Sequence, residues 1–226
     1  MSLSSYLEKM PENQKDIYYI SAETRSQALA SPHLEGFKSK NIPVLIMTDA
    51  IDQFWLPMIG SFKDKKFTSI TQGQINLDDL DEKNKDKKSD SKDQKEKQDK
   101  EFVDLIAQMK VVLGEQVKDI RLSSKLTDSP VCLVADDGDM DIAMEQLMAQ
   151  RDTNYKGAPR ILEINGDHSL IKNMKSLLSK KENNDLVSDA GTLLFEQARL
   201  LEGKMPADPA QFSKIMNQFL IKAIPE

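Results

Sequence analysis

The chain has 226 residues, a length typical of one or two domains. Its 37 acidic residues outnumber 31 basic ones, and a formal charge of -6 argues against a general nucleic-acid-binding protein, which needs clustered, unpaired cations. The sequence has no run of 18 apolar residues, so we expect no membrane-spanning helix and no membrane partner.

Three features suggest where the protein resides and how it was derived. The single cysteine, Cys132, cannot form an intramolecular disulfide and lies in an apolar, β-prone stretch, as expected in a reducing compartment. The N-terminus lacks a secretory leader, so we expect a cytoplasmic protein. Residues 1–3 resemble a vector-derived lead and no loop follows them, which suggests a fragment of a longer protein.

Residues 1–77 alternate between strand and helix patterns. Short apolar runs at 17–20, 43–47 and 67–70 predict strands, and 50–62 predicts a helix. Continuous apolar strands separated by helices are typical of a parallel sheet covered by helices. We therefore expect a small, parallel, three-layer α/β/α unit here.

Residues 78–101 differ sharply in composition from both flanks. Ten of these 24 residues are acidic, eight are lysine, and Leu80 alone is apolar. Such a segment cannot bury a core, so it is either a disordered linker or a solvated helix with ion pairs between successive turns. We place the domain boundary here.

Residues 102–226 predict a mixed α/β domain. An amphipathic helix should run from 102 to a stop at Gly114, and strands should follow at 117–122, 130–135 and 160–164. Asp139 is the expected N-cap of a helix over 140–150. The remaining helices are expected at about 167–180, 185–202 and 208–223.

The stretch LEINGDHSLI (162–171) places Asp167, His168 and Ser169 in consecutive positions. Neighbouring side chains on a helix point about 100° apart, so these three cannot align as a hydrolase triad. We predict instead that Asn165 caps the helix. With no phosphate loop and no metal-ligand spacing in the sequence, we expect no catalytic, cofactor or metal site, and no enzyme activity in this chain.

The last two helices carry broad apolar faces joined by a short turn. Gly203 suits the end of the first helix, and Asp208 and Pro209 suit the start of the second. Two such hairpins could form a dimeric four-helix bundle, or the hairpin could pack on its own domain. The candidate interface residues are Leu186, Ala190, Leu193, Leu194, Leu201, Phe212, Ile215, Met216, Phe219 and Leu220.

Two further apolar groups are candidates for a binding surface. Met140, Met144, Leu147 and Met148 share one face of the predicted helix at 140–150, and methionine is frequent on adaptable binding surfaces. An ordinary core face is the alternative. Phe54 and Trp55 are adjacent, so both cannot face one core, and Pro57 should distort their helix.

Several long stretches in this order resemble the ninety-kilodalton heat-shock chaperone (Hsp90) family in its bacterial form. They are YLEKMPENQKDIYYI (6–20), SPHLEGFKSKNIPVLIMTDAID (31–52), VKDIRLSSKLTDSPVCLVA (117–135), LEINGDHSLI (162–171), LLFEQARLLEG (193–203) and DPAQFSKIMNQFL (208–220). The resemblance spans nearly all of the chain outside the charged run. Gly166 replaces a proline that is usual in the family.

The resemblance implies a chaperone fragment. Residues 1–77 would be the end of the middle domain, and 102–226 the C-terminal dimerisation domain. The hairpin would form the homodimer, and the methionine face, with Phe54 and Trp55, would contact unfolded client proteins. A purely structural dimerisation module is the alternative.

The resemblance also bears on cofactors and other partners. ATP and magnesium are expected only in the full-length protein, so this chain should hold no cofactor. The chain ends AIPE, without the acidic peptide of eukaryotic members, so co-chaperones recruited by that tail are not implied.

Overall fold

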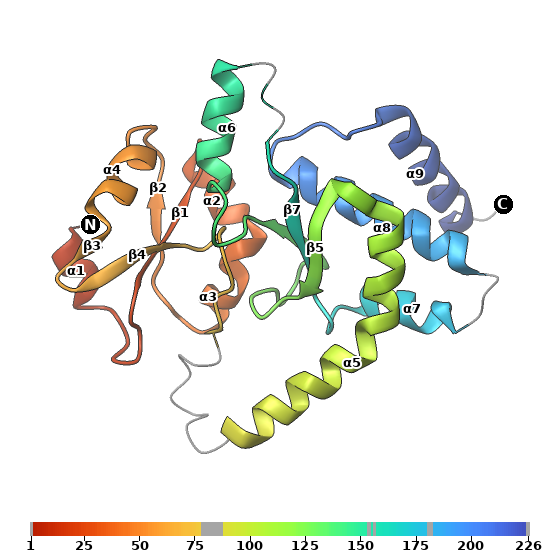
Figure 1. Cartoon of the computed structure of the whole chain (residues 1–226), viewed down its shortest axis with the longest axis horizontal. Coiled ribbons are helices and arrows are strands. Elements are labelled where there is room, and N and C mark those ends of the chain that lie inside the picture. Colours follow the sequence, from red (N-terminus) through yellow and green to blue (C-terminus); the bar gives the residue numbers. More distant parts are fainter. Residues whose placement is uncertain (1, 78–87, 153–154, 156, 180–182, 225–226) are drawn as a thin grey trace.

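The computed structural model describes residues 2–77, 88–152, 155, 157–179 and 183–224. Figure 1 shows two α/β assemblies side by side, which we call the N-terminal half (2–77) and the C-terminal half (88–224). Each half contains a sheet and several helices, which confirms the predicted mixed α/β class.

The N-terminal sheet has four strands in the order β2-β1-β4-β3. The strands are β1 (Ile17–Ser21), β2 (Leu45–Met47), β3 (Ser61–Phe62) and β4 (Lys65–Ser69). Strand β1 is parallel to β2 and β4, as predicted, but β3 is antiparallel to β4. The expectation of an all-parallel sheet was wrong because Lys63 and Asp64 adopt positive φ angles of 48° and 63°, which close a tight hairpin.

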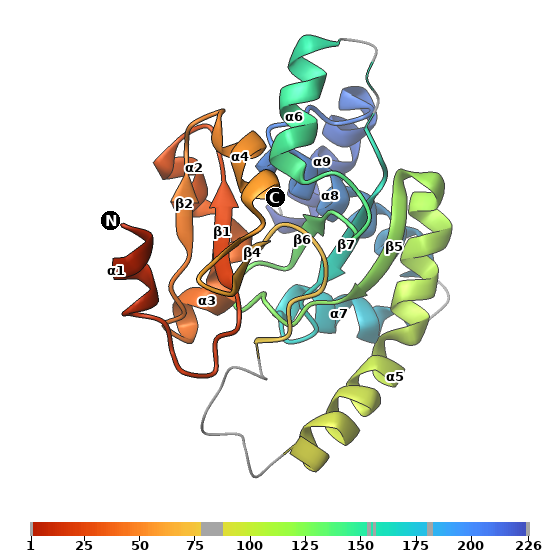
Figure 2. The same cartoon turned by 60° about the vertical axis from the view of Figure 1, so that its left-hand side comes forward.

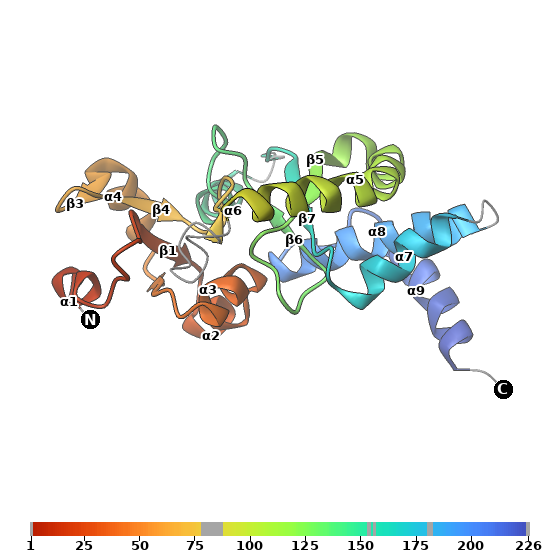
Figure 3. The same ribbon diagram turned by 90° about the horizontal axis from the view of Figure 1, so that it is seen from below.

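Helices lie on both sides of this sheet, with α2 and α3 opposite α4 (Figure 3). The helices are α1 (Leu3–Leu7), α2 (Arg25–Ala30), the 3-10 turn η1 (Pro32–Leu34), α3 (Glu35–Ser39) and α4 (Asp52–Ile59). The core on the α2 and α3 side contains an edge-to-face contact between Tyr18 and Phe37, with ring centroids 5.1 Å apart. Helix α4 is shorter than the predicted 50–62 because the chain turns into β3.

The C-terminal sheet has the order β5-β7-β6, and its central strand is parallel to β5 and antiparallel to β6. The elements are α5 (Lys88–Leu113), η4 (Gly114–Gln116), β5 (Val117–Leu122), β6 (Val131–Val134), α6 (Ile142–Arg151), β7 (Arg160–Ile164), α7 (Ser169–Leu178), α8 (Asn184–Leu201) and α9 (Pro209–Ala223). Helices α5, α7 and α8 share one hydrophobic core with the sheet. Gly114, at φ +50°, follows the last residue of α5, where the sequence predicted the stop.

The charged segment is described only in part. Residues 78–87 lie outside the described residues, and the backbone of 88–101 forms the first turns of α5. The choice between a disordered linker and a solvated helix for 78–101 as a whole stays open. The predicted domain boundary stays a prediction.

Two predicted helix caps were wrong. The N-cap of α7 is His168, whose Nδ1 accepts from the Leu170 N–H at 3.1 Å, whereas Asn165 Oδ1 accepts from the Asp167 N–H in the preceding turn. The N-cap of α6 is Asp141, not Asp139. Asp141 is selected by tertiary structure, because its other oxygen accepts from Ser69 and Thr71 of the N-terminal half.

The two halves are joined by backbone hydrogen bonds as well as side chains. In Figure 2, β6 is the C-terminal strand nearest to β4. Just beyond these strands, the Ala135 N–H donates to the Thr71 carbonyl at 2.9 Å, and the Gly73 N–H donates to the Ala135 carbonyl at 2.8 Å. This short parallel bridge fixes the position of one sheet relative to the other.

Glu35, at the start of α3, forms a second junction. Its carboxylate accepts from the backbone N–H groups of 127, 128 and 129 at 2.8 to 3.1 Å and from the Ser129 hydroxyl. A Cβ on the neighbouring Gly36 would lie 2.5 Å from the Lys125 carbonyl oxygen, so only glycine allows this approach. Burial alone would raise the pKa of Glu35, but the hydrogen bonds from Ser129 and this loop outweigh burial and lower it.

We predict that Glu35→Gln lowers the free energy of unfolding by about 1 kcal/mol at pH 7, because an amide cannot accept all of these hydrogen bonds. The pKa of Glu35 is lower in the folded state, so its stabilisation is present above the carboxyl's unfolded pKa and is lost as pH falls through the folded value. Urea denaturation should therefore show this difference in the free energy of unfolding between the unaltered chain and Glu35→Gln at pH 7, and a smaller difference below about pH 4. The matched control is Glu12→Gln, because Glu12 is exposed. A difference in the free energy of unfolding between the unaltered chain and Glu35→Gln that does not change with pH would contradict the prediction.

Candidate functional site

The C-terminal helices form the predicted hairpin. Gly203 has a φ of +77° just past α8, and Asp208 Oδ1 accepts from the N–H groups of Ala210 and Gln211 at 3.0 and 2.9 Å. The buried carboxylate of Glu196 accepts from the Ala207 N–H and so holds the turn against α8. In Figure 3, α9 extends away from the remainder of the chain.

Three of the ten predicted interface residues are interior. Ala190, Leu194 and Ile215 are 8%, 3% and 5% exposed, and the first two belong to the core shared with α5 and the sheet. These three side chains offer little surface to a partner in this structure, and their place in a dimer interface stays a prediction. The apolar period of α8 identified its buried face but not which element covers it.

The other seven positions retain accessible surface. Leu186, Leu193, Phe212 and Phe219 are half-buried, and Leu201, Met216 and Leu220 are exposed. The sequence analysis missed Ile221, near the end of α9, and Ile224, just past it, which are 73% and 72% exposed and add apolar surface near Met216 and Leu220. Their spacing from Leu220 could have revealed them. A dimer interface at these residues stays a prediction.

Helix α6 carries most of the predicted methionine face and stands out from the sheet in Figure 1. Met140 precedes the helix and is exposed, whereas Met144, Leu147 and Met148 are half-buried. This face is neither fully covered nor fully free. Client binding by these residues stays a prediction.

A buried ion pair anchors α6. Arg160 Nη2 lies 2.6 Å from Glu145 Oε2, with both side chains 3% exposed, and Arg160 Nη1 donates to the Met140 carbonyl at 2.9 Å. Lys204, in the hairpin turn, donates to Glu145 Oε1 at 3.1 Å. Gly157 is required here, because a Cβ would lie 2.4 Å from the same oxygen. Sequence reasoning missed this network, since its members come from three separate segments.

The aromatic pair on α4 is divided as expected. Phe54 is 36% exposed, whereas Trp55 packs edge-to-face on Phe67 at 5.8 Å and donates from Nε1 to Asp52 Oδ1 at 2.7 Å. Pro57 lies within α4. Phe54 is therefore the more exposed member, Trp55 is half-buried, and a client role for either stays a prediction.

The stretch around His168 is arranged as a helix start. His168 Nδ1 is occupied by the cap, and Asp167 pairs with Lys172 at 3.1 Å.

Over the residues that the structure describes, no three His, Cys, Asp or Glu side chains form a group that could hold a metal ion. Within the same residues, no helix is both long and apolar enough to span a membrane.

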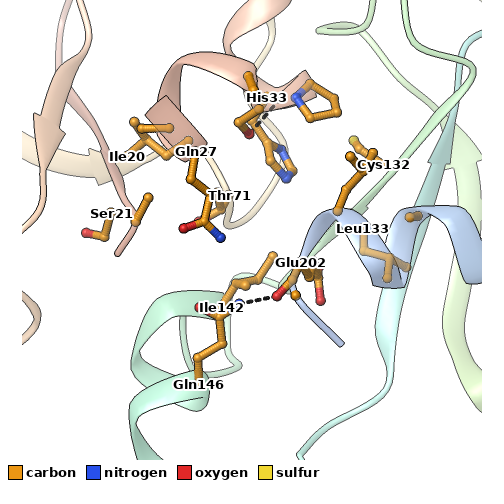
Figure 4. Close-up of a pocket in the computed structure, with 18 of the residues that line it drawn as sticks. Ile20, Ser21, Gln27, His33, Thr71, Cys132, Leu133, Ile142, Gln146 and Glu202 are labelled. Carbon is orange, nitrogen blue, oxygen red and sulfur yellow. Dashed lines mark hydrogen bonds between the residues drawn. The ribbon is translucent and has the colours of Figure 1, made fainter. Parts of the chain in front are cut away.

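A cavity of about 300 Å³ lies where the two halves meet (Figure 4). It is lined from α2, η1, β1, β6, α6 and α8 and by Glu202 and Gly203 at the end of α8. Burial, followed by the charge of Lys125, lowers the pKa of His33 to about 3, so its ring is neutral. Burial also raises the pKa of the Cys132 thiol well above its ordinary value, which makes it unreactive.

Glu202 is the unusual group in this cavity. Its side chain is 7% exposed, and neither carboxylate oxygen accepts a hydrogen bond. Lys204 Nζ is the nearest cation described, at 3.5 Å. Burial raises the pKa of Glu202 to about 7, against the lowering effect of Lys204 and Arg160. No periodic pattern in the sequence points to this residue, which follows a helix in an ordinary turn.

Comparison with known proteins now identifies the family. The family model described as "Hsp90 protein" matches residues 1–225. Proteins named "Chaperone protein HtpG" are similar along the chain: the one from Roseobacter denitrificans is 40% identical over 99% of this chain, and the one from Streptomyces coelicolor 38% over 95%. The chain spans 36% and 33% of those two relatives, about a third of each. On this match, which extends over both halves, the chain belongs to the Hsp90 family.

Proposed function

We propose that this chain is the part of an Hsp90-type chaperone that dimerises and contacts client proteins, and that it acts with an ATP-binding part outside this chain. The similar proteins are named as chaperones, which supports the general role. The proposal assigns a mechanical role to the residues present. The dimer joint would keep two arms at high effective concentration, so that their other ends meet readily.

The packing of α9 is the observation that carries the dimerisation proposal. This helix has 15 residues and a clear apolar face, but only Ile215 is buried. Helices in proteins are stabilised mainly by packing an apolar face against a neighbour. Met216, Leu220, Ile221 and Ile224 lack such a neighbour among the described residues. A second hairpin, related by a two-fold axis, would cover this stripe in both copies.

The surface around α6 supports the client-binding proposal. Flexible methionines that are half-exposed can repack against differing apolar partners. The anchored base of α6 holds these side chains at a defined place while the helix stands clear of the sheet. Helix α4 provides a second exposed apolar surface. It consists of Phe54 together with Met58 and Ile59, which are 86% and 57% exposed.

We predict that Met216→Glu combined with Leu220→Glu converts a dimer into a folded monomer. Light scattering across a dilution series should give twice 25.5 kDa for the unaltered chain and 25.5 kDa for the variant. Burying two carboxylates in an apolar interface should weaken association by at least about 30-fold, or about 2 kcal/mol.

The matched control is Gln211→Glu with Gln218→Glu, which adds the same charge to the opposite, exposed side of α9. The control should remain dimeric. An unaltered chain that is monomeric at every concentration would refute the dimerisation proposal, and so would a Met216/Leu220 variant that dimerises as tightly as the control.

We also predict that Met144→Asp with Met148→Asp reduces the chain's ability to suppress aggregation of a heat-denatured test protein. The substitution removes two apolar contacts worth roughly 1 to 2 kcal/mol together, so about tenfold more protein should be needed. Ala149→Asp with Gln150→Asp is the control, because these exposed residues lie on another side of α6. Equal suppression by both variants, at unchanged mass, would favour the structural dimerisation module with no client contact.

A further inference from the structure

The cavity where the two halves meet, called the junction cavity from here on, has mostly apolar walls and several polar groups without hydrogen bonds. Its walls include Ile20, Ala28, Pro32, Leu133, Ile142 and Ala198. At about 300 Å³, it has room for a small organic molecule. Figure 4 shows the His33 ring and Glu202 on the same cavity, from elements far apart in the sequence.

The unpaired groups in this cavity are two acceptors, the Glu202 carboxylate and the His33 ring, and the Ser21 hydroxyl, which can donate or accept. Both oxygens of the nearly buried Glu202 lack a hydrogen bond. Nδ1 of the neutral His33 ring also lacks a partner, and the ring's hydrogen bond to the Leu133 backbone leaves Nδ1 as the acceptor. Buried acceptors without donors cost free energy, so a ligand that supplies donors would be stabilised here.

The charges around the cavity favour a cation. Lys204 Nζ is 3.1 Å from Glu145 and 3.5 Å from Glu202, so its closer contact is with Glu145. A neighbouring cavity of about 330 Å³ shares Gln146, Glu202 and Gly203 and adds Glu23. The carboxylate of Glu202 is therefore incompletely neutralised, and an exposed acid lies nearby.

From these observations we propose that the junction cavity binds a small molecule with an apolar body and a protonated amine. The apolar body fills the space between α2, β6 and α8, and the ammonium group donates to Glu202. An ammonium group has three donors and no acceptor, which matches the unpaired Glu202 and His33 acceptors, and the Ser21 hydroxyl oxygen can also accept. Binding is non-covalent, because the Cys132 thiol is protonated.

This assignment makes binding depend on pH. The groups that act on Glu202 are Lys204 in its own turn, Glu145 on α6 and Arg160 on β7, and His33 and Cys132 line the same cavity. His33 stays neutral between pH 6 and 8 because its pKa is lowered, and Cys132 stays protonated because its pKa is raised. Glu202 loses its proton over this interval, so an amine should bind more tightly at pH 8 than at pH 6.

Phenethylamine and its neutral analogue 2-phenylethanol test the proposal by ligand-observed NMR titration of the unaltered chain. We expect phenethylamine to bind at least about tenfold more tightly than 2-phenylethanol at pH 8, and this preference to fall at pH 6. Glu202→Gln should abolish the preference, whereas the distant Glu12→Gln should keep it. Both variants are first checked for an unchanged fold by circular dichroism.

Three outcomes would overturn the proposal. They are no binding of phenethylamine, equal binding of the alcohol, or a preference for the amine that survives Glu202→Gln. If Glu202→Gln fails to fold, the comparison of amine with alcohol at two pH values in the unaltered chain still decides. The dimer and client tests do not involve this cavity, so their failure is distinguishable from failure here.

Discussion

The buried ion pair between Glu145 and Arg160 determines where α6 lies. Removing two charges from water is costly, and the cost is offset only when the geometry is close and the remaining polar atoms are satisfied. Here the contact is 2.6 Å, Lys204 and the Ala158 N–H supply further donors to Glu145, and Arg160 Nη1 donates to the Met140 carbonyl, so the carboxylate is satisfied, whereas Arg160 Nε and Nη2 are buried without a hydrogen bond. Loss of one partner would leave a buried charge, so α6, β7 and the hairpin turn are fixed as one unit.

The N-terminal half is fixed to this unit through Asp141. One of its oxygens caps α6 and the other accepts from Ser69 and Thr71. The same residue therefore begins the helix and joins the halves. Together with the Gln72–Ala135 bridge and the Glu35 hydrogen bonds, it makes the junction polar and specific. An apolar junction of equal size would allow more than one relative position of the halves.

The sequence was sufficient for elements with their own periodicity or caps. Strands β5 and β7 have the predicted bounds, and the hairpin turn has glycine, aspartate and proline where local chemistry requires them. The sequence was not sufficient where tertiary contacts determine which of two similar residues takes a structural role, as at the N-cap of α6. Asp139 and Asp141 are similar locally, and the hydroxyl groups of Ser69, in β4, and of Thr71, two residues later, select Asp141. The antiparallel β3 depended on a turn without glycine.

The candidate sites divide in the same way. Apolar stripes on α6, α8 and α9 were visible in the sequence, but periodicity cannot show that Ala190 and Leu194 belong to a core shared with α5, α7 and the sheet. The Glu145 network and the acceptors of the junction cavity come from segments separated by up to about 170 residues of chain, between His33 and Glu202, and no local pattern joins them. Such sites follow from the fold and cannot be found before it.

The turn at 202–204 connects the three regions on which the proposals rest. The Glu202 carbonyl accepts from Gln146 of α6 at 2.6 Å, its carboxylate lies at the junction cavity, and Lys204 reaches Glu145. The same turn begins the connection from α8 to α9. A change in the charge of Glu202 therefore acts on the anchor of α6 and on the hairpin together, because Lys204 lies between the carboxylates of Glu202 and Glu145. This shared cation places the junction cavity beside the anchor of α6 and at the start of the hairpin connection.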